Sequence, residues 1–514
     1  MMDTIRFTWM FVIPLVCSPL VYLIGRLELL VSSKYGGRPL LRLLSVRAWA
    51  FLVLLASWVP YLLALKEFSA GTHLEFAVEA VWLRADAISL LLAGMVLTLG
   101  TLVVLFSGPY MRDEIGEEKF YAMLLAMMGL MIGLGCAGDL FNLWVWFEGM
   151  AISSYLLVAF YREQPASLEA GMKYLVQSAV GSVLVLLGIA LVLANSGSLD
   201  LAALQTNQTG WLVDHRLVAL AAAGLFIIGF GVKVALVPLH SWLPDAHSQA
   251  PSGISAMLSG VVIEAGLIAM LRALGAVALP LDWRMLLLIF GGINMLFGNL
   301  MAFRQTVVKR LLAYSSLAHV GYILLGLGVA LYNGGSAGAQ GAMFHLVTHM
   351  LMKGLAFLSV GALIYGIHLR NGRHDPLLVS ELDGASQKYP LVTLGLSIAL
   401  LGLGGLPPLA GFMSKWQIFA GGFGTGNGWL MALMVFMALN SVLSLGYYAP
   451  LVSRMYRRQA GERVLAGKDL PWQIVTPLII LALLVLLLGF APGVLDGLTV
   501  PAGARFVELF GSMP

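Results

Sequence analysis

Three ionisable side chains recur at four-residue intervals within one strongly apolar stretch of the chain. His345, His349 and Lys353 lie in FHLVTHMLMKG, residues 344–354. Residues four apart on a helix project from nearly the same side, so the three groups would form one polar stripe. A charge at the bilayer centre costs about 2.5–3.5 kcal/mol on insertion. These residue types suit the binding and release of protons, which predicts a functional stripe.

Other apolar segments also contain isolated ionisable residues. The complete candidate set for proton transfer is Glu148, Lys233, Glu264, Lys309, His345, His349, Lys353 and Lys415, with His319 as a further member. A buried lysine gives up its proton more readily than an exposed one, and a nearby carboxylate helps the lysine keep it. A series of acids and bases across a membrane bundle therefore indicates a proton relay.

Several of these residues also have a structural explanation. Glu148 and Lys233 could form an ion pair that only fixes helix register. His319 could be a hydrogen-bonded core histidine, and Lys309 with Arg310 could anchor a helix at the cytoplasmic surface.

Two further patterns have alternatives of their own. The HxxxH spacing of His345 and His349 suits a metal pair, but no third ligand is evident and Lys353 would repel a cation. We therefore expect no metal and no catalytic or cofactor-binding residue in this chain. Asp139 is interpreted as a surface helix cap.

The composition sets the environment in which these groups work. The chain has 514 residues, of which 60% are hydrophobic and 11% charged, with a mean hydropathy of +0.90. Soluble domains carry about 25% charged residues, so the sequence predicts a polytopic membrane protein. The two cysteines, Cys17 and Cys136, form neither a disulfide framework nor an iron–sulfur ligand set. The net charge of +4 gives no reason to expect nucleic acid.

The apolar segments predict an all-α fold with about fourteen transmembrane helices. Their predicted starts lie near residues 7, 45, 87, 120, 140, 172, 217, 253, 285, 310, 341, 389, 428 and 472. Connections after odd-numbered helices hold 20 Lys and Arg residues, and those after even-numbered helices hold 5. This asymmetry predicts that both termini lie on the non-cytoplasmic side. The apolar N-terminal segment is interpreted as a retained first span, and the tail after the last helix as too short for a long helical arm.

Two of the predicted helices contain interruptions. One lies in FGVKVALVPLHSWLP (230–244) and the other in LGLGGLPPLAGFMSKW (401–416). Proline opens a helix, and broken membrane helices at matching places indicate inverted repeats. We therefore predict four parts: N-terminal helices 1–3 (1–119), a first repeat of helices 4–8 (120–275), a second repeat of helices 9–13 (283–458), and a last helix with a short tail (470–514).

Five motifs together resemble one known family. The chain is similar to the antiporter-like, proton-translocating membrane subunits of respiratory complex I, whose relatives occur in multi-subunit Mrp-type Na⁺/H⁺ antiporters and membrane-bound hydrogenases. The motifs are FEGMAISSYLLV around Glu148, VKVALVPLHSWLPDAHSQAPS (232–252), VKRLLAYSSLAHVGY (308–322), HLVTHMLMKGLAFL (345–358) and GLPPLAGFMSKW (405–416).

The resemblance implies roles at matching positions. Glu148 would modulate Lys233, its ion-pair partner and the proton-holding centre of the first half-channel, and Lys415 would lie on the exit side. The linking hydrophilic axis would comprise Lys309, His345, His349 and Lys353. Glu264 departs from the family pattern, because most relatives carry lysine or histidine there. We expect Glu264 either to pair with a lysine of that axis or to favour a cation such as Na⁺.

The sequence thus predicts a proton-translocating subunit of a redox-driven, complex I-type assembly in a prokaryotic plasma membrane. NADH, flavin, iron–sulfur clusters and quinone are expected only in partner subunits. The expected partners are other membrane subunits, the lipid bilayer and protons, with Na⁺ as the alternative ion. The alternatives are a subunit of a Na⁺/H⁺ antiporter or of a membrane-bound hydrogenase, a coupling subunit of inorganic-carbon uptake, and a scaffold whose charges only fix helix register.

Overall fold

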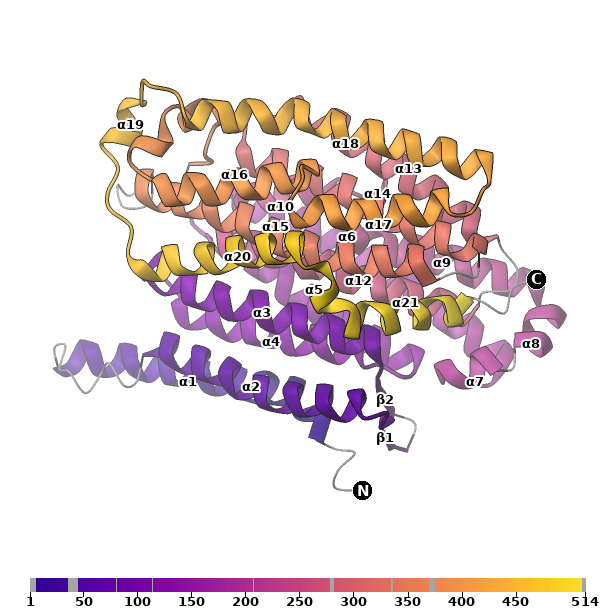
Figure 1. Ribbon diagram of the computed structural model, residues 1–514. Coiled ribbons are helices and arrows are strands. Elements are labelled where there is room, and N and C mark those ends of the chain that lie inside the picture. The colour runs from indigo at the N-terminus through magenta and orange to yellow at the C-terminus, as the bar shows by residue number, and fades with distance from the viewer. Residues whose placement is uncertain are drawn as a thin grey trace.

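The fold is a bundle of long helices that run roughly alongside one another, as the computed structural model shows (Figure 1). The structure describes residues 6–35, 45–79, 81–112, 114–206, 208–277, 282–333, 336–368 and 375–510. Four of the loop cations counted above, Arg38, Arg42, Arg370 and Arg373, lie outside these residues. Twelve described helices are long and apolar enough to cross a membrane. The predicted count of fourteen therefore remains a prediction.

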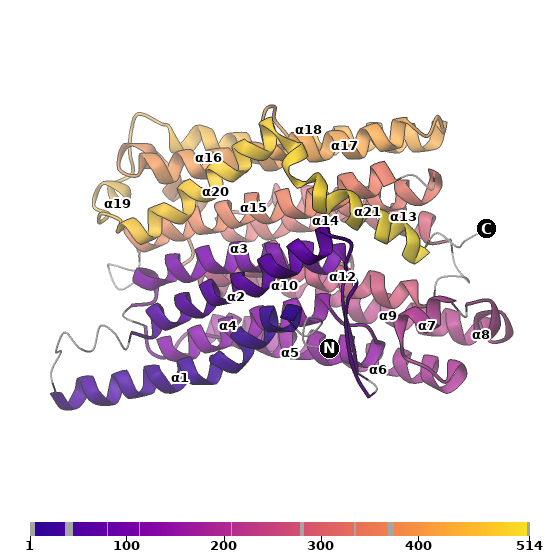
Figure 2. The ribbon, with the colours of Figure 1, turned by 60° about the horizontal axis from the view of Figure 1, so that its bottom comes forward.

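The N-terminal part supplies one edge of the bundle and a buried helix behind it. Its elements are η1 (Arg6–Thr8), α1 (Trp9–Tyr35), α2 (Val46–Ser69), the strands β1 (Leu74–Val78) and β2 (Val81–Ala85), and α3 (Ala87–Tyr110). In Figure 2, α1 and α2 lie on the outside and α3 lies inward of them. Asp86 caps α3 by accepting a hydrogen bond from the Ser89 amide, which fixes where this helix begins.

The middle of the chain forms the first group of core helices. These are α4 (Glu117–Gly135), α5 (Leu140–Val158), α6 (Pro165–Ser196), the short α7 (Leu201–Thr206) and α8 (Gln208–Asp214), α9 (Arg216–Val234), α10 (Trp242–Gln249), α11 (Ser252–Met257), η3 (Leu258–Val262) and α12 (Ile263–Gly275). The last three make one continuous, fully buried span. Its middle part, η3, is a π-helix, a local widening that often marks functional sites. It ends directly before the segment that carries Glu264.

The second group of core helices surrounds α15. It comprises α13 (Trp283–Ala302), α14 (Val308–Asn333), α15 (Ser336–Ile367), η5 (Val379–Leu382), η6 (Ala385–Gln387), α16 (Pro390–Gly404), α17 (Ala410–Phe423) and α18 (Gly428–Met455). The chain ends with α19 (Glu462–Leu465), α20 (Trp472–Phe490), η7 (Pro492–Leu495) and α21 (Asp496–Phe510). α15 packs against α14, α16, α17, α20 and α21, and it therefore lies at the centre of this half.

The first predicted break lies between α9 and α10. Ala235 adopts a left-handed conformation with φ of 58° and ends α9. The carbonyls freed there have protein partners: the Trp242 indole donates to Val232 O (2.7 Å), and the Asn294 side chain donates to Ala235 O (3.3 Å). Irregular backbone at membrane depth needs such partners, because lipid supplies none.

The second predicted break lies between α16 and α17. Gly405, with φ of 82°, ends α16 in a conformation that glycine adopts without strain. The Ser441 hydroxyl donates to Gly404 O (3.0 Å), and Lys415 donates to Leu403 O (2.8 Å). Both interruptions are therefore confirmed, and at the second one a candidate site residue itself satisfies a freed carbonyl.

Candidate functional site

Lys233 is held at the end of α9, immediately before the first break. Its side chain is 1% exposed. The ammonium donates to the hydroxyls of Ser154 (3.0 Å) and Tyr174 (2.5 Å), and it lies 4.5 Å from the centre of the Tyr174 ring. The lysine stem packs against α12, since a Cβ on Gly266 would come within 3.0 Å of Lys233 Cγ. Lys233 is therefore positioned between α5, α6 and the helix that carries Glu264.

Glu148 lies on α5 near this lysine without touching it. Among the described residues no salt bridge joins Glu148 to Lys233, so the structure does not contain the ion pair suggested by the sequence. Glu148 does act on Lys233 electrostatically, and its Oε2 atom is buried without a hydrogen-bond partner among the described residues. The glutamate can thus influence the lysine through its charge, while the ammonium makes its hydrogen bonds to Ser154 and Tyr174.

A run of buried polar side chains crosses from α12 to α17 through three histidines, joined by three hydrogen-bond contacts and one ring stack. Glu264 Oε1 is 2.7 Å from His349 Nδ1, and the His349 ring stacks on His319 with a centroid separation of 5.0 Å. His319 Nδ1 is 3.0 Å from His345 Nε2, and His345 Nδ1 is 2.8 Å from the Ser414 hydroxyl. We call these five residues the histidine run. Each of them is at most 1% exposed, and Ser414 directly precedes Lys415 in the chain.

The histidine run bears on two expectations, the partner of Glu264 and the role of His319. The lysine partner predicted for Glu264 is wrong, because the carboxylate contacts His349 instead. His319, which had a structural explanation as a core histidine, bonds directly to His345. The atoms Glu264 Oε2 and His349 Nε2 have no hydrogen-bond partner among the described residues. Buried polar atoms of this kind are normally served by water, which also conducts protons.

The two lysines predicted for the linking axis use different partners. Lys353, fully buried on α15, donates to Leu312 O (2.7 Å) and to the Ser315 hydroxyl, which in turn contacts Tyr448. Lys309 is 4% exposed and donates to Ala250 O (2.7 Å), at the end of α10. Lys309 is therefore no surface anchor.

The neighbouring Arg310 does have the role of an anchor. Its guanidinium is 35% exposed and forms a salt bridge to Asp245 of α10 (2.6 Å), and Asp245 also pairs with Lys173 of α6 (3.0 Å). Adjacent cations of α14 thus point to different environments. One faces the bundle interior and the other faces the loop surface.

Lys415 lies just beyond the second break, on α17. Its ammonium donates to Leu403 O and to the Ser441 hydroxyl, both at 2.8 Å, and lies 4.4 Å from the centre of the Tyr322 ring. The side chain is 2% exposed. Lys415 therefore resembles Lys233 in being buried, bonded to neutral oxygen atoms and placed over a tyrosine ring.

His247 is a buried histidine that the residue-by-residue analysis of the sequence missed. It lies on α10, is fully buried, and stacks on Phe357 of α15 with a centroid separation of 4.8 Å. Neither ring nitrogen has a hydrogen-bond partner among the described residues. Lys309 and Lys353 both act on it electrostatically. The signal was present, because His247 is part of the quoted motif VKVALVPLHSWLPDAHSQAPS.

A second feature that sequence reasoning missed is an ionic network where α3, α12 and α21 meet. Asp86 accepts from Arg272 (2.8 Å) and lies 3.4 Å from Arg505. Burial raises the pKa of Asp86, but Arg272, the Ser89 hydrogen bonds and Arg505 outweigh this, so the pKa lies below its ordinary value. These side chains line a cavity of about 370 Å³ together with Glu75 of β1. This network ties the helix of Glu264 to the C-terminal helix.

Asp139 is a cap, as predicted, but not at the surface. It accepts from the Asn142 amide (2.8 Å) at the start of α5 and from the Trp82 amide (3.2 Å) of β2. Its side chain is 4% exposed. The carboxylate therefore joins the hairpin to the bundle as well as beginning a helix.

These observations define a class of protein: a multi-span membrane protein with two broken helices and a buried series of lysines, histidines and a glutamate in its interior. Two family profiles match the chain. The profile described as "NADH:quinone oxidoreductase/Mrp antiporter, TM" matches residues 137–444, and the one described as "NADH-Ubiquinone oxidoreductase (complex I), chain 5 N-terminus" matches residues 76–121. The chain belongs to the NADH:quinone oxidoreductase/Mrp antiporter membrane-subunit family.

Individual relatives agree with this assignment. The chain is 32% identical over 415 residues to F(420)H(2) dehydrogenase subunit N of Methanosarcina mazei, covering 79% of this chain and 82% of the relative. It is 33% identical over 414 residues to NADH-quinone oxidoreductase subunit N of Trichlorobacter lovleyi, covering 79% and 81%.

Solved structures share the fold over nearly the whole chain. A chain of respiratory complex I from Thermus thermophilus matches with a TM-score of 0.74 at 27% identity, covering 96% of this chain and 100% of that one. A chain of the archaeal membrane-bound sulfane sulfur reductase matches with a TM-score of 0.83 at 26% identity, covering 98% of both. A chain of the Mrp complex from a Dietzia species matches with a TM-score of 0.82 at 21% identity, covering 99% and 100%, which shows a common fold.

Proposed function

We propose that this chain is an antiporter-like subunit that moves protons through a redox-driven, complex I-type membrane assembly. The observation that carries the proposal is the histidine run. It joins the first group of core helices to the second without leaving the protein interior, and it ends beside Lys415. Buried acids and bases in hydrogen-bond contact are the usual elements of a proton relay in membrane proteins.

In this proposal each residue has a defined task. Lys233 holds a proton in the first half, and the charge of Glu148 sets how firmly it is held. Glu264 and His349 exchange a proton across their direct contact, and His319 and His345 pass it on toward Lys415. Lys309, Lys353 and His247 form a second buried group beside this route. Family membership supports these tasks. The hydrogen bonds described above give a neighbour to each of these residues except Glu148 and His247.

The contacts of Glu264 favour protons over sodium as the transported ion. Na⁺, like other hard cations, prefers several oxygen ligands. The hydrogen-bond partner of Glu264 is an imidazole, and imidazoles continue the run. A carboxylate–imidazole pair exchanges protons readily, because both groups titrate within a few units of neutral pH.

Finer features of the proposal follow the sequence analysis. We infer fourteen spans, of which ten form two inverted five-helix repeats, residues 120–275 and 283–458. Both termini lie on the non-cytoplasmic side of a prokaryotic plasma membrane. Redox cofactors and quinone belong to partner subunits. Membership of a family that also contains Mrp-type subunits supports a second candidate, in which the chain belongs to a Na⁺/H⁺ antiporter or a membrane-bound hydrogenase.

Purification of the tagged full-length chain from its native membrane in mild detergent tests the proposal. All co-purifying subunits are identified, and the assembly is reconstituted into proteoliposomes that contain a pH-sensitive dye. Iron–sulfur or quinone-reactive subunits, together with proton uptake driven by an electron donor, are the expected result. An assembly without redox subunits whose proton flux follows an imposed sodium gradient would favour the antiporter instead. An assembly that moves no protons under either condition would contradict both.

A further inference from the structure

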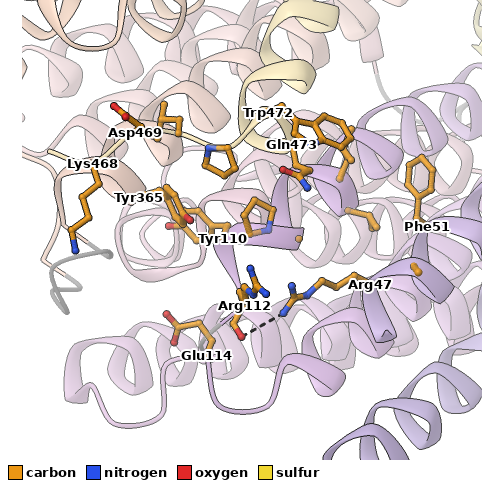
Figure 3. A pocket seen from close by; sticks show the side chains of 17 residues that line it. Arg47, Phe51, Tyr110, Arg112, Glu114, Tyr365, Lys468, Asp469, Trp472 and Gln473 are labelled. Carbon is orange, nitrogen blue, oxygen red and sulfur yellow. Dashed lines mark hydrogen bonds between the residues drawn. The ribbon is translucent and has the colours of Figure 1, made fainter. Parts of the chain in front are cut away.

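A large cavity lies at one end of the bundle, in a crevice between α2 and α20. Its volume is about 1190 Å³. α3 forms the floor, and the segment that precedes α20 closes one side. Figure 3 shows Arg47 and Arg112 along one wall and Lys468 and Trp472 along the other. None of the residues proposed for proton transfer lines this cavity.

The lining combines cations with aromatic rings. Three cations, Arg47, Arg112 and Lys468, line the cavity with two carboxylates, Glu114 and Asp469. The Arg47 guanidinium also pairs with Glu117 and donates to Arg112 O (3.4 Å). Asp469 is 96% exposed and pairs with Lys388, which does not line the cavity. The rings of Phe51, Tyr110, Tyr365 and Trp472 complete the lining. Cations beside amphipathic rings are typical of the level at which lipid head groups meet a membrane protein.

Further along the same three helices lies a separate apolar hollow. A second cavity of about 200 Å³ is lined by Trp58 and Tyr61 of α2, Met95 of α3, and Leu484 and Leu488 of α20. From Arg47 to Tyr61 the helical rise is about 21 Å, because each residue adds about 1.5 Å. This length exceeds half of the hydrocarbon thickness of about 30 Å. The two cavities together are therefore long enough for a head group and most of an acyl chain.

We infer that this crevice binds a membrane phospholipid, with its phosphodiester among Arg47, Arg112 and Lys468 and one acyl chain in the apolar hollow between α2 and α20. The cations at the polar end can bind a phosphate group. The apolar cavity further along the same helices favours a lipid, rather than a free anion, as the molecule that carries this phosphate. A helix of a partner subunit could also occupy the apolar end between α2 and α20. Such a helix would, however, place its own apolar, lipid-facing side chains against the three cations at the other end, which is unfavourable. The inference does not depend on the proposed proton transport.

Two glycines with open space around them, one inside the crevice and one outside it, allow a controlled test of the lipid site. A Cβ on Gly108, which lines the large cavity, would meet no atom within 4 Å, and the same holds for Gly224 of α9, outside the crevice. Gly108→Leu should therefore fill the lipid site without disturbing the fold, and Gly224→Leu is its control. For charge, Arg112→Gln removes an exposed cation of the cavity, and Arg162→Gln removes an exposed cation elsewhere.

The experiment is saturation binding of radiolabelled dioleoyl phosphatidylglycerol to the purified, detergent-solubilised assembly. We expect retained binding that dioleoylglycerol, which lacks the phosphate, and inorganic phosphate both fail to displace. Arg112→Gln and Lys468→Gln should each weaken binding about fivefold, as expected for one cation near a lipid phosphate. Gly108→Leu should abolish the site, and the two control variants should bind like the parent chain.

Three results would overturn the inference. Equal losses in Gly108→Leu and Gly224→Leu would indicate general contact with the bilayer. Displacement by inorganic phosphate would indicate a free-anion site. A photo-reactive group at position 472 that captures only a partner subunit in the native membrane would assign the apolar hollow to a protein. If Gly108→Leu fails to assemble, Arg112→Gln against Arg162→Gln decides the question.

Discussion

Lys233 and Lys415 occupy comparable places at the two broken helices, yet their surroundings differ. Both ammonium groups are buried, both donate to neutral oxygen atoms, and both lie about 4.5 Å from a tyrosine ring. Lys233 precedes its break, and Lys415 follows its own. Lys233 also has a carboxylate, Glu148, within electrostatic range, whereas the contacts of Lys415 are a backbone carbonyl, a hydroxyl and a ring.

This difference assigns different tasks to the two lysines. A lysine with a nearby carboxylate can be switched by anything that moves either charge, because their attraction is strong in a low-dielectric interior. A lysine among neutral partners takes its protons from whatever relay reaches it. The histidine run arrives beside Lys415 and not beside Lys233. We therefore expect control at the first break and delivery at the second.

Removal of either ammonium should have the largest effect. Lys233→Met and Lys415→Met should each lower driven proton flux about a hundredfold, since each removes a group that binds the transported proton. Subunit composition should not change. The measurement is dye-reported flux in proteoliposomes of the purified assembly. Loss of assembly with normal flux in the remaining complex would favour the scaffold interpretation.

Neutralising the Glu148 carboxylate should affect the task of Lys233 and not that of Lys415. Glu148→Gln should lower flux about tenfold, because attraction between charges in the protein interior is worth more than 1 kcal/mol. Among the described residues no carboxylate contacts Lys415, so the effect is expected to come through Lys233. The double variant Glu148→Gln with Lys233→Met should transport no worse than Lys233→Met alone. Additive losses would contradict a shared task.

Substitution of the tyrosines beside the two lysines, Tyr174 and Tyr322, should lower proton flux by a smaller factor. The Tyr174 hydroxyl accepts a hydrogen bond from Lys233, whereas Lys415 meets the ring of Tyr322. Tyr174→Phe should lower flux about fivefold, the equivalent of one hydrogen bond of about 1 kcal/mol. Tyr322→Phe keeps the ring and should have the weaker effect. A larger loss of flux in Tyr322→Phe than in Tyr174→Phe, measured in the same assay, would contradict the difference proposed between the two lysines.

The smallest predicted effect tests the packing of Lys233 against α12. A Cβ at position 266 would crowd Lys233 Cγ at 3.0 Å, so Gly266→Ala should shift the lysine stem by a few tenths of an ångström. We expect flux to fall about twofold, within the range of a mild packing change. Gly292→Ala, whose Cβ would have only an ordinary contact at 3.9 Å, should have no effect. Equal behaviour of the two variants would remove α12 from the positioning of Lys233.

Much of the fold could be predicted because apolar length and helix breakers are local signals. The predicted starts near 87, 140, 428 and 472 agree with helices that begin at Ala87, Leu140, Gly428 and Trp472. Both interruptions were predicted from proline and glycine. The hairpin β1–β2 and the helix α21 were not, since each is short and depends on packing against the bundle.

The site was predictable in membership but not in pairing. The position of isolated ionisable residues inside apolar segments, together with the family motifs, predicted the lysines, histidines and glutamates of the candidate set but not His247. Their partners depend on which helices pack together: Glu264 and His349 are 85 positions apart, and Asp86 and Arg272 are 186 apart. A single sequence contains no signal for such contacts. The π-helix before Glu264 likewise follows from tertiary packing.

The most direct test of the account is proton flux through an assembly whose histidine run is cut between His319 and Ser414. His345→Gln keeps a polar side chain but cannot carry a proton, and His345 is the residue that joins His319 to Ser414. His368 is the matched control, because it is 2% exposed and bonded to Asp375 O and Glu381 outside the run. The account predicts at least about a tenfold loss of flux in His345→Gln and none in His368→Gln. Normal flux in His345→Gln would contradict it.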